Sequence, residues 1–136
     1  MKTYKYILIL LLGFFSSKLS AQTNLTRWID KCTNLDNVEA TVIHKQDSET
    51  GKKERTTIKI IFSNGNRELQ NELIDAFNKD KPDAVRYAEK NENGQMLPDL
   101  CRFLDKQRKM ETRFVFHFNV AGENMVLMTV RDDYKE

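Results

Sequence analysis

The residues of this chain best suited to chemistry are two cysteines and two histidines, Cys32, Cys101, His44 and His117. A cysteine acts as a nucleophile when a histidine takes its proton, and a third group must orient that histidine. The sequence offers no such group at a recognisable spacing. A structural zinc site needs about four ligands at short characteristic spacings, which two isolated histidines do not supply. We therefore predict no catalytic residue, no metal site and no cofactor.

Other signatures of catalysis are also missing. The sequence contains no GxSxG, HExxH or GxGxxG motif. Neighbouring carboxylates occur at Asp80 and Asp83 and at Asp132 and Asp133. General acid and base work needs a concave site and one raised pKa, whereas these pairs fall at a helix end and in the C-terminal tail. We expect all four to be solvated surface residues, and the chain not to be an enzyme.

Basic residues gather mainly in two predicted loops. They are Lys52, Lys53, Arg55, Lys106, Arg108, Lys109 and Arg113. If the loop tips were adjacent, these side chains could hold a phosphate, a sulfate or an acidic glycan. Ordinary solvated turns are the simpler interpretation.

The N-terminus has the layout of an export signal. Lys2 and Lys5 precede an apolar run at residues 7–15, and a small-residue stretch follows and ends at Ala21. A membrane-spanning helix needs about 20 apolar residues, roughly twice this run. A lipoprotein needs a cysteine directly after the cut, whereas the first cysteine is Cys32. We predict a signal peptide at residues 1–21 and a soluble protein, periplasmic or secreted, without a membrane span after signal removal.

Export changes how the two cysteines are interpreted. Disulfides persist in oxidising compartments, and one pair allows a single connectivity, Cys32 to Cys101. Such a bridge would close a loop of about 70 residues and stabilise the fold by about 4 kcal/mol. The alternative is two buried free thiols. We favour the disulfide.

Size and charge narrow the class of protein further. Of 136 residues, 115 remain after removal of the first 21, which is one domain over residues 22–136. The full chain has 22 basic and 20 acidic residues, and three of the lysines lie in the signal, so the mature net charge is −1. A near-neutral domain has no long-range field to attract phosphate backbones, so we expect no nucleic-acid partner.

Hydrophobic periodicity predicts two helices and several strands. Leu25, Trp28, Ile29 and Cys32 share one face of a short helix, and Asn24 is placed to cap its first turn. The other expected segments are a helix over 67–79 and strands around 38–42, 55–62, 84–90, 100–104, 112–120 and 125–130. A polar stretch over 46–53 is expected to be a hairpin loop.

The predicted order is helix, hairpin, helix, then up to four strands. It is typical of the α+β class and not of alternating β-α-β units. We expect an antiparallel sheet of four to six strands with both helices packed on one face. That packing would bury Trp28 and Leu73 against Ile58 and Phe116. Pro98 is expected to limit how early the strand after it begins.

Several features occur together along this layout. They are a signal that ends in Ser20-Ala21-Gln22, a strand pair ending at Phe62, a helix carrying Leu73-Ile74-Asp75-Ala76-Phe77 followed by Lys79-Asp80, Tyr87 in the next strand, and a closing hairpin. The layout resembles that of small exported proteins of Bacteroidota catalogued as domains of unknown function, over most of residues 36–131. The resemblance implies a cell-envelope or secreted setting and brings no catalytic residue.

Two functions are compatible with these observations. The residues account for a complete small core and leave no group of catalytic side chains. This favours a non-catalytic exported interaction domain, which uses its sheet edge or loop tips to bind another envelope protein. The alternative is a module that binds a small ligand or glycan, in a pocket between the sheet and the helix over 67–79.

Overall fold

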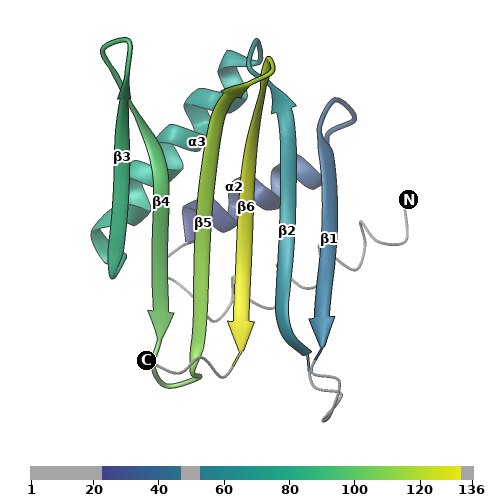
Figure 1. Ribbon diagram of the computed structural model, residues 1–136, viewed down its shortest axis with the longest axis vertical. Helices are drawn as coiled ribbons and strands as arrows, with labels where there is room; N and C mark the ends of the chain where they lie inside the picture. Colours follow the sequence, from purple (N-terminus) through teal and green to yellow (C-terminus); the bar gives the residue numbers. More distant parts are fainter. Residues whose placement is uncertain (1–22, 47–52, 133–136) are drawn as a thin grey trace.

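The computed structural model describes residues 23–46 and 53–132, so the predicted signal and most of the predicted 46–53 loop lie outside the described residues. In chain order the elements are α2 (Thr23–Thr33), β1 (Glu39–Gln46), β2 (Lys53–Ser63), α3 (Arg67–Asp80), a 3-10 turn η1 (Lys81–Asp83), β3 (Arg86–Glu92), β4 (Gln95–Asp105), β5 (Met110–Val120) and β6 (Glu123–Asp132). In Figure 1 the strands stand side by side in one sheet, and both helices lie behind it.

The sheet has six strands in the order β1-β2-β6-β5-β4-β3. Every neighbouring pair is antiparallel. The predicted α+β class with an antiparallel sheet is therefore confirmed. The last strand, β6, lies between β2 and β5, so it joins the N-terminal hairpin to the later strands.

Alternation along the strands divides the sheet into a buried and an open side. On β2, Ile58, Ile60 and Phe62 are buried, and on β5 Phe114 and Phe116 are buried. Side chains of one strand alternate between the two faces, so these residues share the helix side. They form one core cluster with apolar residues of α2 and α3. The sheet surface turned away from the helices is called the open face below.

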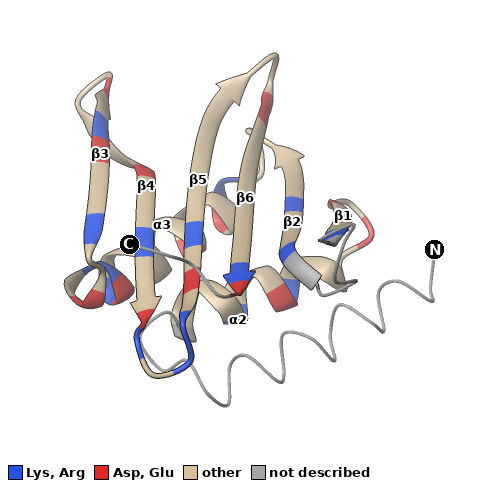
Figure 2. Ribbon diagram, turned by 60° about the horizontal axis from the view of Figure 1, so that its bottom comes forward, with Lys and Arg blue, Asp and Glu red and all other residues tan. Residues whose placement is uncertain are grey.

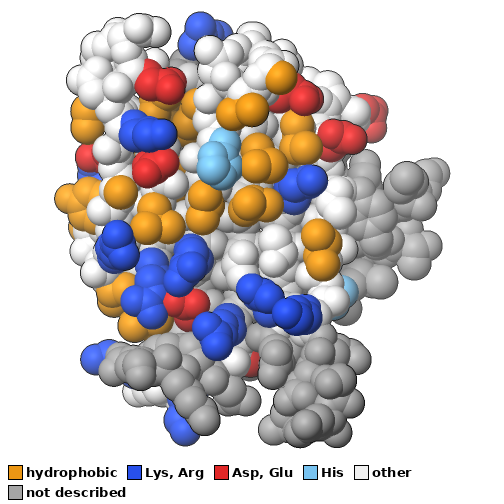
Figure 3. Space-filling view, in the orientation of Figure 1, with side chains coloured by type: hydrophobic (Ala, Val, Ile, Leu, Met, Phe, Trp, Pro, Cys, Tyr) orange, Lys and Arg blue, Asp and Glu red, His pale blue; other side chains and the backbone are white. Residues whose placement is uncertain are grey.

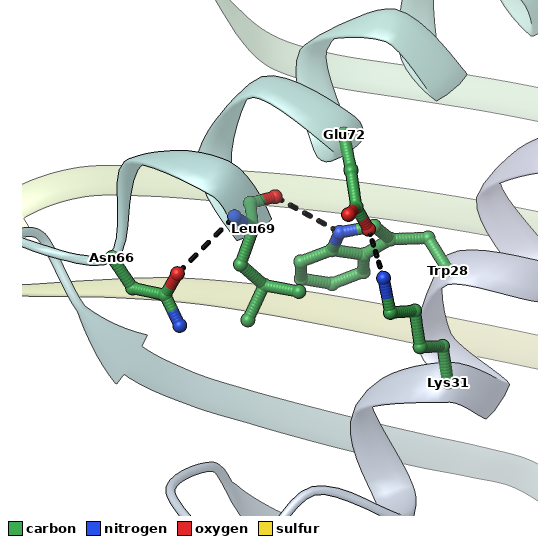
Figure 4. A network of polar contacts seen from close by, with 5 residues as sticks. All are labelled: Trp28, Lys31, Asn66, Leu69 and Glu72. Carbon is green, nitrogen blue, oxygen red and sulfur yellow. Dashed lines mark hydrogen bonds and ion pairs between the residues drawn. The ribbon is translucent and has the colours of Figure 1, made fainter.

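The two helices are joined by polar contacts as well as by packing (Figure 4). The Trp28 indole N–H donates to the Leu69 carbonyl at 3.1 Å, and Lys31 pairs with Glu72. Asn66 caps α3, since its side-chain oxygen accepts from the Leu69 amide at 3.2 Å. The contacts of Trp28 and Lys31 hold the middle of α2 against the first half of α3.

Asp80, at the end of α3, was predicted to be solvated. This prediction is wrong, because the residue is buried. Its carboxylate accepts the Leu25 amide at 2.8 Å and the Asn24 side-chain amide at 2.8 Å. The first N–H groups of a helix lack partners within it, and a carboxylate there also complements the helix dipole. Asn24 is therefore not the cap of α2, because α2 begins one residue earlier and Asp80 takes that role. Burial raises the pKa of Asp80, although its hydrogen bonds from Leu25 and Asn24 oppose the rise.

The predicted disulfide is not present, because Cys32 and Cys101 are both buried free thiols. Cys32 lies near the end of α2, a helix that packs on α3, β1 and β2, whereas Cys101 lies on β4, which packs against α3. The two cysteines thus belong to different parts of the core. Burial raises the pKa of each thiol to about 12. Protonated thiols are poor nucleophiles and oxidise slowly.

The strand around Cys101 starts earlier than Pro98 was expected to allow, since β4 begins at Gln95. Pairing of β4 with β5 begins only at Leu100, and the register between β3 and β4 shifts next to Pro98. Proline has no N–H to give to a ladder and is tolerated where a strand lacks a neighbour or bulges. Pro98 occupies such a position.

Replacement of Asp80 tests its capping role. We expect Asp80→Ala to lower the free energy of unfolding by about 1–3 kcal/mol, because it leaves buried N–H groups without an acceptor. Asp80→Asn keeps one acceptor oxygen and should cost less. Urea denaturation followed by circular dichroism measures both. Asp83→Ala, at an exposed position, is the matched control, and an equal loss in that variant would contradict the capping role.

Thiol titration tests the state of the cysteines. With an aromatic disulfide reagent at pH 8, the folded protein should react slowly, because both thiols are buried and protonated. In denaturant without reductant, two thiols per chain should react. If thiols reacted in denaturant only after a reductant had been added, the chain would contain the disulfide and the prediction would be wrong.

Candidate functional site

The residues first considered for catalysis lie apart. His44 lies on β1 with its Nδ1 at 3.2 Å from the Thr56 hydroxyl oxygen, whereas His117 lies on β5, with β2 and β6 between the two strands. Cys101 lies on β4, next to β5, but it is buried on the helix side opposite Phe114, whereas His117 lies on the other face of the sheet. Within residues 23–46 and 53–132, no three His, Cys, Asp or Glu side chains are grouped so that they could hold a metal ion.

The basic residues expected in two loops divide between a loop and the sheet. Lys106, Arg108 and Lys109 lie in the β4–β5 loop, visible at the bottom of Figure 2, and Arg108 pairs with Asp105 at 3.2 Å. Lys52 lies outside the described residues, and Lys53 begins β2. Arg55 and Arg113 belong to the strands β2 and β5. The tip of the first predicted loop lies outside the described residues, whereas the strand positions indicate another candidate site.

Five arginines lie on the open face in two adjacent cross-strand rows. The first row pairs Arg86 with Arg102 and Arg102 with Arg113, across β3, β4 and β5. The second row pairs Arg55 of β2 with Arg131 of β6. Directly paired residues of antiparallel strands project from the same face. We call these five residues the arginine band.

The figures show how the band lies on the molecule. Figure 2 shows basic segments at one level on β3, β4 and β5. In Figure 3, Lys and Arg side chains cross the lower half of the open face. The band thus spans most of the width of the sheet.

One carboxylate, Glu111, lies within the band and is almost fully buried by its neighbours. It pairs directly with the Arg102 guanidinium and, at 3.4 Å, with that of Arg113. Burial works to raise the pKa of Glu111, but the hydrogen bonds and charges of Arg102 and Arg113 outweigh it, and the net pKa is lowered. Glu111 therefore orders Arg102 and Arg113. It also lies directly opposite Arg131 in the strand register, and Arg55, Arg86 and Arg131 remain exposed.

Beside the band, the next cross-strand row is apolar on β4, β5 and β6 and carries Lys59 on β2. Leu127 of β6 pairs with Val115 of β5, and Val115 with Leu100 of β4, and all three are half-buried. Ile61 and Met125 pair in the row beyond. Figure 3 shows hydrophobic side chains gathered above the basic ones. We call these five apolar residues the apolar strip.

The sequence pattern alone assigns four of the five arginines to the solvent side of a strand. Arg55, Arg102, Arg113 and Arg131 each stand next to a buried strand position, whereas Arg86 has exposed residues on both sides. Alternation assigns the first four to the solvent face. It does not show which strands are neighbours, so it could not bring them together.

Comparison with known families assigns the chain to a family. The chain belongs to the family described as Domain of unknown function (DUF5024). The match covers residues 22–131. It confirms the resemblance to a domain of unknown function. No curated protein matches the chain.

The lowered pKa of Glu111 predicts a pH-dependent contribution to stability. A carboxyl whose folded pKa is depressed stabilises the fold above its ordinary value of 4.5 and loses that contribution as the pH falls through the folded pKa. We expect Glu111→Gln to lower the unfolding free energy at pH 7 and to flatten its decline between about pH 5 and pH 2. Urea denaturation over that range measures both changes.

Glu123→Gln, at an exposed position of β6, is the control and should keep the slope of the original chain. If the Glu111→Gln protein lost stability with acid in parallel with the original, the ion pairs of Glu111 would not contribute to stability.

Proposed function

We propose that this chain is an exported, non-catalytic interaction domain whose open face binds an acidic surface of a partner protein. The arginine band is the observation that carries the proposal. Within the part of the chain that the structure describes, the five guanidinium groups of the band share one carboxylate, Glu111, so the band keeps a local excess of positive charge. Arginine is enriched at protein interfaces, since its planar group binds carboxylates through paired hydrogen bonds.

The apolar strip favours a protein as the partner. Protein interfaces combine an apolar centre with a polar and charged rim, and arginine is frequent among the residues that dominate binding. The strip of Leu100, Val115 and Leu127 adjoins the band on the same face. A partner that covers both would bury apolar surface and pair its carboxylates with the arginines.

A nucleic acid fits the same face less well. Phosphate backbones are attracted by a long-range positive field, and the mature chain carries a net charge of −1. The apolar strip also offers nothing to a phosphate backbone. An acidic protein surface can pair with the arginine band and also pack against the apolar strip.

Two observations support the non-catalytic part of the proposal. Burial raises the pKa of both thiols to about 12, which makes them poor nucleophiles. The two histidines lie on strands that are not neighbours. His117 is one strand away from Cys101, but Cys101 pairs with the buried Phe114 on the helix side, and alternation places His117 on the open face.

Export rests on the sequence of the N-terminus. Positively charged, apolar and small-residue segments follow one another up to Ala21, and the family match begins at the next residue. No helix in the described part of the chain is long and apolar enough to cross a membrane. We place the mature domain in the periplasm or outside the cell.

A charge-reversal variant separates binding from folding. Arg55 opposes Arg131, and Arg86 opposes Arg102, so Arg55→Glu with Arg86→Glu turns two like-charge pairs into opposite-charge pairs. Opposite charges across strands are worth about 0.2–1 kcal/mol each. We expect the variant to melt at the same or a higher temperature and yet to lose its partner. In-cell cross-linking of the tagged chain in its native host, followed by affinity capture and mass spectrometry, measures the loss.

The control reverses two exposed charges on the helices, Arg27→Glu and Lys79→Glu, with the same change in net charge. This control variant should still capture an acidic partner protein. The amount captured should fall as the salt concentration rises. Equal capture by both variants, or capture of nucleic acid instead, would contradict the proposal. The mass of the captured chain itself reports whether residues 1–21 were removed, and an intact N-terminus would contradict export by this signal.

A further inference from the structure

The sheet divides at one end, between β4 and β5. These strands pair from Leu100 and Val115 to Asp105 and Met110 and no further. Beyond that point β4 continues with β3, and β5 continues with β6. Figure 1 shows the β3–β4 hairpin leaning away from β5 at this end. We call the gap between residues 95–99 and 116–120 the split.

A cavity of about 230 Å³ lies where the split meets the first turn of α3. Its lining is dominated by carboxamides, namely Asn64, Gln70, Asn93, Gln95, Asn119 and Asn124. These come from the β2–α3 connection, α3, the β3–β4 turn, and the ends of β4, β5 and β6.

Several of these amides are fixed by one another. Asn64 donates to the Asn119 side-chain oxygen at 2.7 Å, and Asn124 donates to the Gln70 oxygen at 3.3 Å. The Asn124 oxygen in turn accepts the Asn119 backbone amide at 2.8 Å. A carboxamide has two N–H donors and one oxygen with two lone pairs, so each keeps further donor or acceptor capacity. The cavity therefore has an ordered polar wall.

A second hollow of about 100 Å³ adjoins the first, and Glu92, Leu97 and Phe118 line both. Phe118 is only partly buried, although it packs against the core. The two hollows thus lie next to each other along the split, and the residues that they share provide an apolar side and a carboxylate. A ligand longer than the cavity would extend along the split toward the second hollow.

The chemistry of the lining selects the class of ligand. Neutral amides both donate and accept, as sugar hydroxyls do, and the partly exposed Phe118 ring offers a surface on which the C–H face of a sugar can lie. The charged lining residues of the first cavity, Arg67 and Glu92, are one of each sign, so neither a cation nor an anion is favoured. We propose that the split binds a short neutral oligosaccharide. This site lies at one end of the sheet and is separate from the arginine band.

A tryptophan placed at the mouth of the cavity tests the proposal. Gln95 lines the cavity and is exposed at the first position of β4, so Gln95→Trp should fill the opening without disturbing the core. Gln107→Trp, also exposed, makes the same change in the β4–β5 loop at the far end of that strand and is the matched control. The probes are cellobiose, maltose and N,N′-diacetylchitobiose, with glucuronic acid as the charged comparison.

Nuclear magnetic resonance titration of the ¹⁵N-labelled chain gives the readout. We expect at least one neutral disaccharide to shift side-chain amide signals of the lining, and glucuronic acid not to do so. Gln95→Trp should abolish the shifts, Gln107→Trp should keep them, and Gln95→Ala should weaken binding by about five- to tenfold, the worth of one hydrogen bond.

The amide spectrum of each variant shows directly whether it is folded. No shift with any neutral probe at saturating millimolar concentration, or shifts that persist in Gln95→Trp, would overturn the proposal. Stronger binding of glucuronic acid than of the neutral sugars would also overturn it. Loss of protein capture by the Arg55→Glu, Arg86→Glu variant bears only on the arginine band, so the two proposals fail independently.

Discussion

The buried carboxylate of Asp80 fixes how the two helices cross, and the rest of the structure depends on that crossing. It holds the first turn of α2 at the end of α3, through Leu25 and Asn24. The Trp28 indole binds the Leu69 carbonyl one turn further along α2. With α2 attached to α3 at two points, the apolar faces of both helices are directed at one side of the sheet. The other side is left open for the arginine band and the apolar strip.

Local patterns in the sequence predicted the elements well. Helical spacing predicted a helix over 67–79, and α3 spans Arg67–Asp80. Strict alternation predicted a strand over 112–120, and β5 spans Met110–Val120. These patterns work because each element must bury one face, and its period records which residues do so.

Relations between distant residues were not predictable in this way. Asp80 lies at a helix end, where a carboxylate is usually solvated, and its partner Leu25 is 55 residues away. The disulfide was inferred from the expected compartment, which says nothing of where Cys32 and Cys101 lie in the core. The arginine band depends on strand order, and alternation within one strand cannot show that β6 inserts between β2 and β5. The band exists only once this long-range pairing has formed, and long-range strand pairing is slow to form because a long loop must close first.

The split in the sheet also divides the stability of the β3–β4 hairpin into two parts. Near its base, Tyr87 lies edge-on against Phe77, with ring centroids 6.2 Å apart, and Glu89 pairs with Lys81 at 3.0 Å. Toward the turn, the hairpin has β-pairing only between its own strands. A two-stranded ribbon is marginally stable without a third strand or a covering helix. The backbone amides near the turn therefore exchange with solvent through small local openings, whereas those near the base exchange only when the core opens.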